Sequence, residues 1–360
     1  MAKAKKESAP KTVEVKYDDG TVVTVDPSKK GKLSKRESTG YAFIIPYVIA
    51  FCVFSVYPVF KTLYLSFTQY KGGIGIEPQW VGLAKYDLTI HDPLFWKSLV
   101  NTVRIWGVNI VLQLGLAFLL TIVFIDIKYK VKGLAVYRAI YYLPNIIAAT
   151  SIAFMFSSLL DPNYGTFNQI LTEIRNLWVV IYNHIPFIHD IMHESGGVTV
   201  RMFDYMRPHA VRTEWLGSSK YCASTIGVIQ AWMWFGNSFI MLMAGVMGIS
   251  SDYYEASSID GAGRWKQFTK ITLPLLKPIM LYVGVTSLIG GLQMFDLPQI
   301  MIAKTTASYM SIRTVIMYLY QFGFGQNKDV GRAAAIAYVL FFIILIFSLM
   351  QFIAMRSEED

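Results

Sequence analysis

Six stretches of this chain are long and apolar enough to cross a lipid bilayer. A helix needs roughly 20 mainly apolar residues to span the hydrocarbon layer, and inside lipid every backbone polar group must be paired within the protein. We therefore expect one helical span in each of six windows: Tyr41–Phe67, Leu99–Ile125, Leu134–Leu160, Tyr221–Ile249, Leu275–Pro298 and Gly331–Met355. These windows predict an all-α membrane protein with six transmembrane helices.

The composition excludes an ordinary soluble protein. Hydrophobic residues make up 54% of the chain and charged residues 16%, whereas a soluble domain carries about 25% charged residues. The segment Leu177–Ile188 is a rival for a seventh span, but Asn183, His184 and Pro186 interrupt it. Because it is too short to cross, we expect it to be an interfacial or surface helix.

Lysine and arginine placement predicts the orientation in the membrane, because these residues are enriched in cytoplasmic loops. Ten of them lie in residues 1–40, and two short connections hold more. With six crossings these regions lie on one side, so we expect both termini in the cytoplasm of a bacterial or archaeal cell. The net charge of +9 then reflects topology rather than a nucleic-acid surface. The residues in the connections are Lys128, Lys130, Lys132, Arg264, Lys266 and Lys270.

The ends and loops set the domain boundaries. Residues 1–40 form a basic extension in which "TVEVKYDDGTVVTVD" alternates apolar and polar residues around a turn. This pattern indicates a small hairpin, although a lone hairpin is marginal in water and a solvated tail is the alternative. Residues 41–356 form the membrane domain, with a long external insertion at about 161–220. We expect its part from Glu173 to Arg212 to pack over the cavity mouth or against a binding protein.

No enzyme or metal signature stands out. The insertion holds four of the five histidines, and "HDIMHE" has Asp190 where the zinc proteases place glutamate. Surface histidines are the alternative to a metal site, and we expect no metal. Cys52 and Cys222 form neither a disulfide framework nor a metal site. Phosphate loops and dinucleotide fingerprints are absent from the sequence, so the chain itself should bind no ATP and no cofactor.

A polar loop at about 250–274 separates two of the apolar windows, and it reads "SSDYYEASSIDGAGRWKQFTKITLP". We expect a helix from Ser251 to Asp260, which ends where Gly261 and Gly263 allow positive φ. A second helix should begin near Arg264, and Pro274 suits the start of the fifth span. The pattern predicts a short helical elbow that projects from the membrane. An amphipathic helix on the lipid headgroups is the alternative.

The spacing within this loop resembles a family signature. Glu255-Ala256-Ser257, then Gly261, then Ile271-Thr272-Leu273-Pro274 matches the Glu-Ala-Ala…Gly…Ile-x-Leu-Pro signature of ABC importer permeases, with Ser257 in place of the second alanine. The stretches "YYLPNIIAA", "DPNYGTFNQIL" and "QMFD" are similar to the maltose-type sugar permeases. The basic extension and the length of the insertion depart from that pattern, as does Thr305–Ser308, where Thr-x-Gly-Gly-Pro is usual.

The resemblance implies a type I ABC importer permease. It implies a second homologous permease, two ATP-binding cassette subunits that bind ATP and magnesium, and an extracytoplasmic sugar-binding protein as partners. It also implies that the elbow docks on an ATPase subunit, so that ATP-driven closure moves the helices. The coupling residues are then Glu255, Ala256, Ser257, Asp260, Gly261 and Gly263.

Polar and aromatic residues within the spans mark a candidate sugar path, because sugar sites combine aromatic faces with hydrogen-bonding groups. The candidates are Gln230, Trp232, Trp234, Asn237, Gln293 and Asp296. Polar residues at membrane depth face a cavity or tie two helices together, and both readings stay open. The aromatic residues can also be interface anchors or core.

Other functions remain open at this point. The solute can instead be a polyol or a glycerophosphodiester. An ion-coupled secondary transporter would need paired carboxylates inside the spans, and only Asp296 lies deep enough. A membrane-bound enzyme would need a nucleophile and a base, and no such pair stands out.

Overall fold

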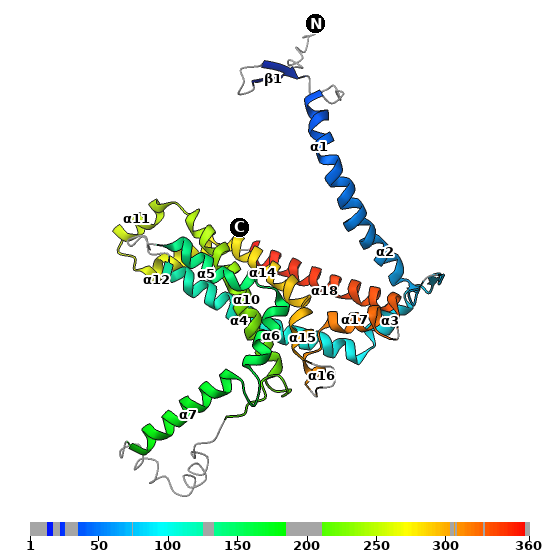
Figure 1. Cartoon of the computed structure of the whole chain (residues 1–360). Coiled ribbons are helices and arrows are strands. Elements are labelled where there is room, and N and C mark those ends of the chain that lie inside the picture. The colour runs from blue at the N-terminus through cyan, green and yellow to red at the C-terminus, as the bar shows by residue number, and fades with distance from the viewer. Residues whose placement is uncertain are drawn as a thin grey trace. The chain divides into compact units, whose positions relative to one another are not determined.

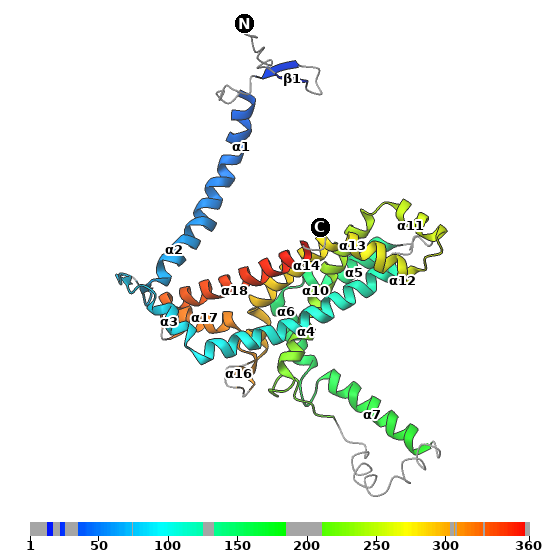
Figure 2. The same ribbon diagram turned by 180° about the vertical axis from the view of Figure 1, so that it is seen from behind.

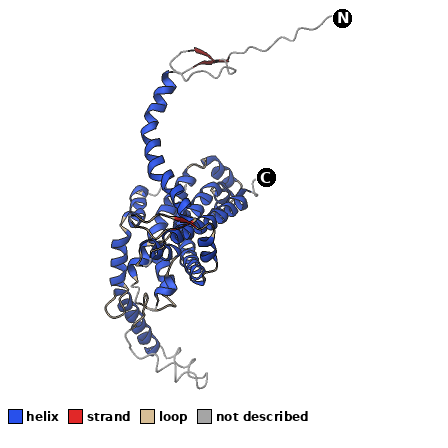
Figure 3. Cartoon of the chain, turned by 90° about the vertical axis from the view of Figure 1, so that its right-hand side faces the viewer, coloured by secondary structure: helices blue, strands red, loops and turns tan. Residues whose placement is uncertain are grey.

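The computed structural model describes residues 13–16, 22–25, 35–73, 75–124, 133–184, 211–302, 306, 308–326 and 328–356. Helices dominate it (Figure 3), and the chain divides into two compact units, Met1–Thr62 and Leu63–Asp360. The elements up to the first long helix are β1 Val13–Lys16, β2 Val22–Val25, α1 Lys35–Phe51, η1 Cys52–Val56, α2 Tyr57–Ser66, β3 Thr68–Gln69, β4 Gln79–Trp80, α3 Ala84–Ile90 and α4 Pro93–Phe124. The later elements are α5 Leu134–Ile146, α6 Ala149–Leu159, α7 Thr166–His184, α10 Cys222–Met247, α11 Ser251–Ile259, α12 Arg264–Gln267, η2 Phe268–Thr272, α13 Leu273–Leu275, α14 Lys277–Leu292, α15 Asp296–Met301, α16 Tyr309–Ile312, α17 Val315–Phe324 and α18 Val330–Arg356.

The first unit begins with the expected hairpin. Strands β1 and β2 pair antiparallel, with Val13 opposite Val25 and Lys16 opposite Val22, so the alternating pattern around Asp-Asp-Gly did predict a hairpin. A helix follows, and one π-helical turn, η1, separates α1 from α2. Pro46 lies inside α1. Together these helices supply the candidate span Phe43–Ser66.

Membrane-spanning candidates in the described chain number five single helices, or six if a bent pair counts as one span. The bent pair is α5 and α6, which meet at 89° in the third predicted window. Pro144 lies in the last turn of α5. Since proline removes a backbone N–H and clashes with the preceding turn, the helix ends soon afterwards and Ile147 is extended. The third window is therefore broken rather than one straight helix.

Helix α10 lies at the centre of the second unit, and 67% of its span window is buried. It packs beside α4 and α5 (Figures 1 and 2). Its approach to α5 depends on Gly236, where an added Cβ would lie 1.9 Å from the carbonyl oxygen of Tyr141. Phe239 and Leu242 are fully buried on the same helix. Small residues that allow such close helix contact are typical of membrane bundles.

The second unit has two distinct ends. Helices α11 and α12 lie at one end of the bundle, and α3 and α17 lie at the other (Figures 1 and 2). We call the second the distal end, comprising α3, α16, α17 and the start of α18. Helix α7 covers residues 177–184 of the expected surface helix. The remainder of that segment, His189, His193 and His209, and the basic link at 125–132 lie outside the described residues.

Candidate coupling loop and transport path

The polar loop forms the two short helices that its sequence predicts. Helix α11 runs from Ser251 to Ile259, and the Ser250 side chain caps it by accepting a hydrogen bond from the Asp252 backbone N–H. Serine satisfies free N–H groups at a helix start, and Asp252 adds a negative charge where the helix dipole favours one. The helix therefore begins because of Ser250 and Asp252, immediately after the long span of α10.

A glycine-dependent turn ends α11. Gly261 has a φ of +74°, which is a left-handed conformation that glycine adopts without strain. The Ala262 N–H donates to the Ser257 carbonyl at 2.9 Å, and the Gly261 N–H donates to the Ser258 carbonyl at 3.1 Å. This pair of bonds is the Schellman motif. The prediction of positive φ is confirmed at Gly261 but wrong at Gly263, whose φ is −70°. Gly263 precedes α12 in extended conformation, as many residues could.

Side-chain contacts fasten the two short helices into one elbow. Gln267 donates through Nε2 to Ser257 Oγ and to Ser258 Oγ, both at 2.9 Å. Tyr254 is buried, and its hydroxyl lies 2.9 Å from Thr272 Oγ1. Ser257, the departure from the Glu-Ala-Ala pattern, is thus used to hold α12. These contacts make the loop a preformed projection rather than a flexible link.

The outer surface of the elbow is exposed and mixed in character. Glu255, Ala256 and Asp260 are exposed, and within the described residues neither carboxylate has an ion pair that would occupy it. Two large apolar side chains accompany them, Ile259 at 87% and Trp265 at 69% exposure. Exposed apolar groups beside unpaired carboxylates are typical of a surface that a partner covers.

The fifth span begins later than predicted. Pro274 lies in the separate turn α13, and the long helix α14 starts at Lys277 with Pro278 in its first turn. Leu276 is both the C-cap of α13 and the N-cap of α14. Proline suits a first turn because its missing N–H would be unpaired there, and Pro278 meets that condition for the span itself.

The path candidates on α10 fall into two groups. Gln230, Trp234 and Asn237 share one face of the helix by spacing. Gln230 is buried, and within the described part of the chain its Oε1 has no hydrogen-bond partner, while Asn237 is half-buried. Trp234 packs on α14, since a Cβ on Gly290 would lie 2.6 Å from the ring. Trp232 instead packs edge-to-face on Phe156 of α6 at 5.4 Å, which is a core contact.

The remaining candidates lie where the fifth span breaks. Helix α14 ends at Leu292 and α15 begins at Asp296, so Gln293 follows the end of one helix and Asp296 starts the next. Both residues are exposed. The structure therefore brings Trp234 to the glycine pair at the end of α14, a few residues before Gln293. An interrupted helix offers free backbone groups beside polar side chains, which suits binding of an uncharged polar solute.

Sequence reasoning missed a buried polar cluster between three helices. Gln113 of α4 donates through Nε2 to Ser238 Oγ of α10 at 2.7 Å. Its Oε1 accepts from Ser287 Oγ of α14 at 3.2 Å and from Asn109 Nδ2 at 3.3 Å. All four residues are at most 4% exposed. The sequence signal for this cluster was the pair Asn109 and Gln113, two amides four residues apart inside an apolar window.

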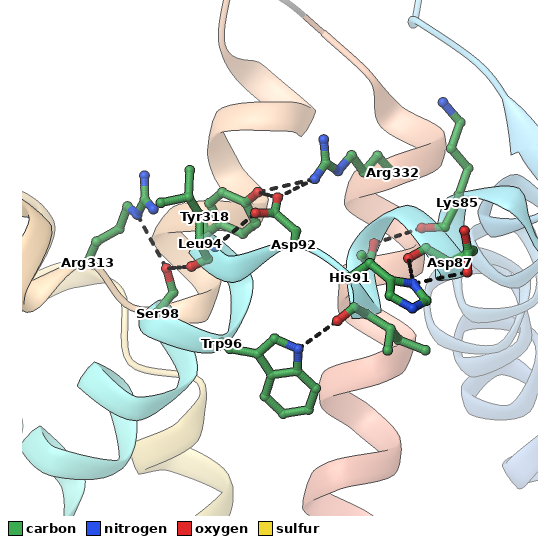
Figure 4. A network of polar contacts seen from close by, with 12 residues as sticks. Lys85, Asp87, His91, Asp92, Leu94, Trp96, Ser98, Arg313, Tyr318 and Arg332 are labelled. Carbon is green, nitrogen blue, oxygen red and sulfur yellow. Dashed lines mark hydrogen bonds and ion pairs between the residues drawn. The ribbon is translucent and has the colours of Figure 1, made fainter.

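A second cluster that sequence reasoning missed holds the distal end together (Figure 4). Asp92 bonds to Arg332 and to the Tyr318 hydroxyl, and Lys85 pairs with Asp329 at 2.7 Å. Burial opposes the ionised form of Asp92, but hydrogen bonds from Tyr318 and the Leu94 N–H, together with the Arg332 charge, outweigh it and lower its pKa. The cluster joins α3 and the loop before α4 to α17 and the start of α18.

The chain matches the family model described as "Binding-protein-dependent transport system inner membrane component" over residues 47–357. A probable ABC transporter permease of Bacillus subtilis (strain 168), YesP, is 29% identical over 91% of this chain and 94% of its own length. The lactose permease LacF of Rhizobium radiobacter is 27% identical over 89% and 95%. The trehalose/maltose permease MalF of Thermococcus litoralis is 27% identical over 93% and 100%.

A solved structure shows the same fold. It is a crystal structure of a bacterial ABC transporter involved in the import of the acidic polysaccharide alginate, with a TM-score of 0.68 at 22% identity. The match covers 90% of this chain and 96% of that chain. The predicted type I ABC importer permease fold is therefore confirmed. In the described part of the chain, no group of three or more His, Cys, Asp or Glu side chains could hold a metal ion.

Proposed function

Because the chain belongs to the binding-protein-dependent transport system inner membrane components, we propose that it is the permease subunit of an ATP-driven importer of sugars or oligosaccharides. The observation that carries this proposal is the family match across residues 47–357. Several relatives of nearly full coverage carry sugar names: the lactose, arabinooligosaccharide and trehalose/maltose permeases. Their names support a sugar rather than a polyol or glycerophosphodiester as the solute.

The elbow formed by α11 and α12 is the proposed contact with the ATP-hydrolysing subunits. Its exposed carboxylates, Glu255 and Asp260, offer charges for basic side chains of a partner. Its exposed Ile259 and Trp265 offer apolar area that contact would bury. The Schellman turn at Gly261 and the Gln267 bonds fix its shape, so a push on the elbow is transmitted to α10 and α14 rather than absorbed by the loop.

The solute path proposed here follows the α10 face that meets the broken end of the fifth span. Asn237 and Gln293 supply hydrogen-bonding groups, and Trp234, which packs on α14 at Gly290, supplies an aromatic face. Exposure of Gln293 and Asp296 within an apolar span supports this assignment, since polar groups at membrane depth face a cavity or another protein surface. Gln230 is a second-line candidate because it is buried in this conformation.

The remaining partners follow from the same assignment. A second homologous permease would complete the path, and an extracytoplasmic binding protein would deliver the sugar at the distal end. The elbow and both termini would then lie in the cytoplasm, with residues 1–40 as a basic extension there. The insertion at 161–220 would lie outside, within reach of the binding protein. ATP and magnesium would bind to the ATPase subunits and not to this chain.

Purification from native membranes tests this proposal. The full chain carries a C-terminal tag, and the proteins that copurify are identified by mass spectrometry, together with any sugar released on denaturation. We expect a second permease of this family and an ATP-binding cassette subunit in stoichiometric amounts. Recovery of the chain alone, with solute uptake that an ion gradient drives in the absence of any ATPase, would instead support a secondary transporter.

A further inference from the structure

The cluster around Gln113 lies at a position that matters for moving the solute. Helix α10 leads into the elbow and helix α14 leads out of it. Gln113 bonds to both, through Ser238 on α10 at 2.7 Å and Ser287 on α14 at 3.2 Å. Each of these residues lies about 15 Å from the elbow-side end of its own helix. That depth is the middle of a hydrocarbon layer about 30 Å thick.

The bonding capacity of the cluster is incompletely used. Asn109 is fully buried, and its Nδ2 donates to Gln113 Oε1. Among the residues that the structure describes, its own Oδ1 has no hydrogen-bond partner. A buried polar atom without a partner costs free energy, and its presence in a native structure needs an explanation. Gln113 Nε2 has two hydrogens, and one is given to Ser238. A rearrangement that turns the second toward Asn109 Oδ1 would satisfy it.

From this geometry we infer that Gln113 is a positioning residue for transport, which sets the spacing of the two elbow-flanking helices at mid-membrane and exchanges hydrogen bonds when that spacing changes. This inference rests on the proposed function for its transport readout. One amide shared between α10 and α14 ties their motions together. The unpartnered Asn109 oxygen supplies the acceptor for a second arrangement, so the cluster has two bonding patterns rather than one. Packed elements with two discrete arrangements are what couple distant sites.

The test compares two buried amides on the same helix. Gln113→Leu removes the shared bonds at nearly constant volume. Asn101→Leu is the matched control, because Asn101 is 4% exposed and, among the described residues, donates only to the backbone carbonyls of Met310 and Arg313 at the distal end, at 3.0 and 3.3 Å. Both variants are purified as the native complex, and sugar uptake and ATP hydrolysis are measured in proteoliposomes.

We expect Gln113→Leu to lower the amount of sugar moved per ATP by about thirtyfold, the factor expected from two hydrogen bonds of ordinary strength, with Asn101→Leu unchanged in that ratio. An unchanged ratio in Gln113→Leu would overturn the inference. If Gln113→Leu does not accumulate, Ser238→Ala and Ser287→Ala each remove one bond with little volume change. Wild-type ratios in both would overturn it equally.

A second readout separates this inference from the proposed function. Spin labels at Met247→Cys and Leu275→Cys, in a chain whose two cysteines are replaced by serine, report the spacing between the elbow-side end of α10 and the turn α13 that leads into α14. We expect a broader distance distribution in Gln113→Leu than in Asn101→Leu. Identical distributions would refute the positioning role. A wild-type complex that moves no sugar would count against the proposed function, while the spin-label distances would still decide the role of Gln113.

Discussion

Gly261→Val should disable the elbow, and Gly263→Val should not. Gly261 has a φ of +74° and Gly263 a φ of −70°, while an added Cβ would meet nothing within 4 Å at either position. The two substitutions therefore differ in backbone strain and not in crowding. A residue with a Cβ in the left-handed region costs roughly 1–2 kcal/mol, and a β-branched side chain costs more.

Loss of the turn would add to that cost. The Schellman bonds from Gly261 and Ala262, at 3.1 and 2.9 Å, are each worth about 1 kcal/mol net. The total, about 3–4 kcal/mol, is large for the nine-residue helix α11. Isolated helices shorter than about 12–15 residues are marginal in water, so the elbow would lose its fixed shape.

The assay has two parts. Pull-down from detergent extract measures how much ATPase subunit remains bound, and proteoliposomes measure sugar uptake. For Gly261→Val we expect normal membrane insertion, because insertion depends on the hydrophobicity of the spans, with loss of docking or of ATP-driven uptake. Gly263→Val should match the wild type. Equal behaviour of the two variants would refute the backbone argument and favour a helix that merely lies on the lipid headgroups.

Three further outcomes are expected. Asn237→Ala and Gln293→Ala should each lower uptake several-fold at subsaturating sugar and leave assembly of the complex unchanged, since one hydrogen bond to an uncharged group is worth about 1 kcal/mol. Wild-type uptake in both variants would remove these residues from the path. Asp92→Asn should lower the free energy of unfolding by about 2 kcal/mol, measured by thermal unfolding. Because the Asp92 pKa lies below its ordinary 3.8, the stability difference between wild type and variant should persist at neutral pH and shrink as pH falls below about 4. Asp87→Asn, on an exposed side chain, is the control. A cysteine at His193 should react with an impermeant reagent in intact cells, and reaction only after lysis would reverse the proposed orientation.

The sequence predicted the features that depend on local physics. Apolar windows of sufficient length became helices, and the Gly261 turn formed where the α11 pattern ended. The same reasoning failed at Gly263, because glycine permits positive φ without requiring it. The break at Ile147 was also missed, although Pro144 was visible in the window, because proline kinks some membrane helices without ending them.

Features that depend on which faces meet could not be predicted in the same way. Gln113, Ser238 and Ser287 are far apart in sequence, and each is unremarkable within its own window. Only the packing of α4, α10 and α14 brings them within hydrogen-bond distance. The distal cluster of Asp92, Tyr318 and Arg332 is similar, since it joins a loop before α4 to helices more than 200 residues later.

Sugar uptake in proteoliposomes tests the central claim most directly. The complex that copurifies with the full chain is reconstituted with ATP inside or outside, and a panel of radiolabelled mono- and oligosaccharides is supplied with the copurifying binding protein. We predict uptake of at least one sugar that requires ATP on the elbow side of the membrane and stops when the ATPase subunit is omitted. Uptake that continues without ATP and follows an ion gradient would contradict the assignment.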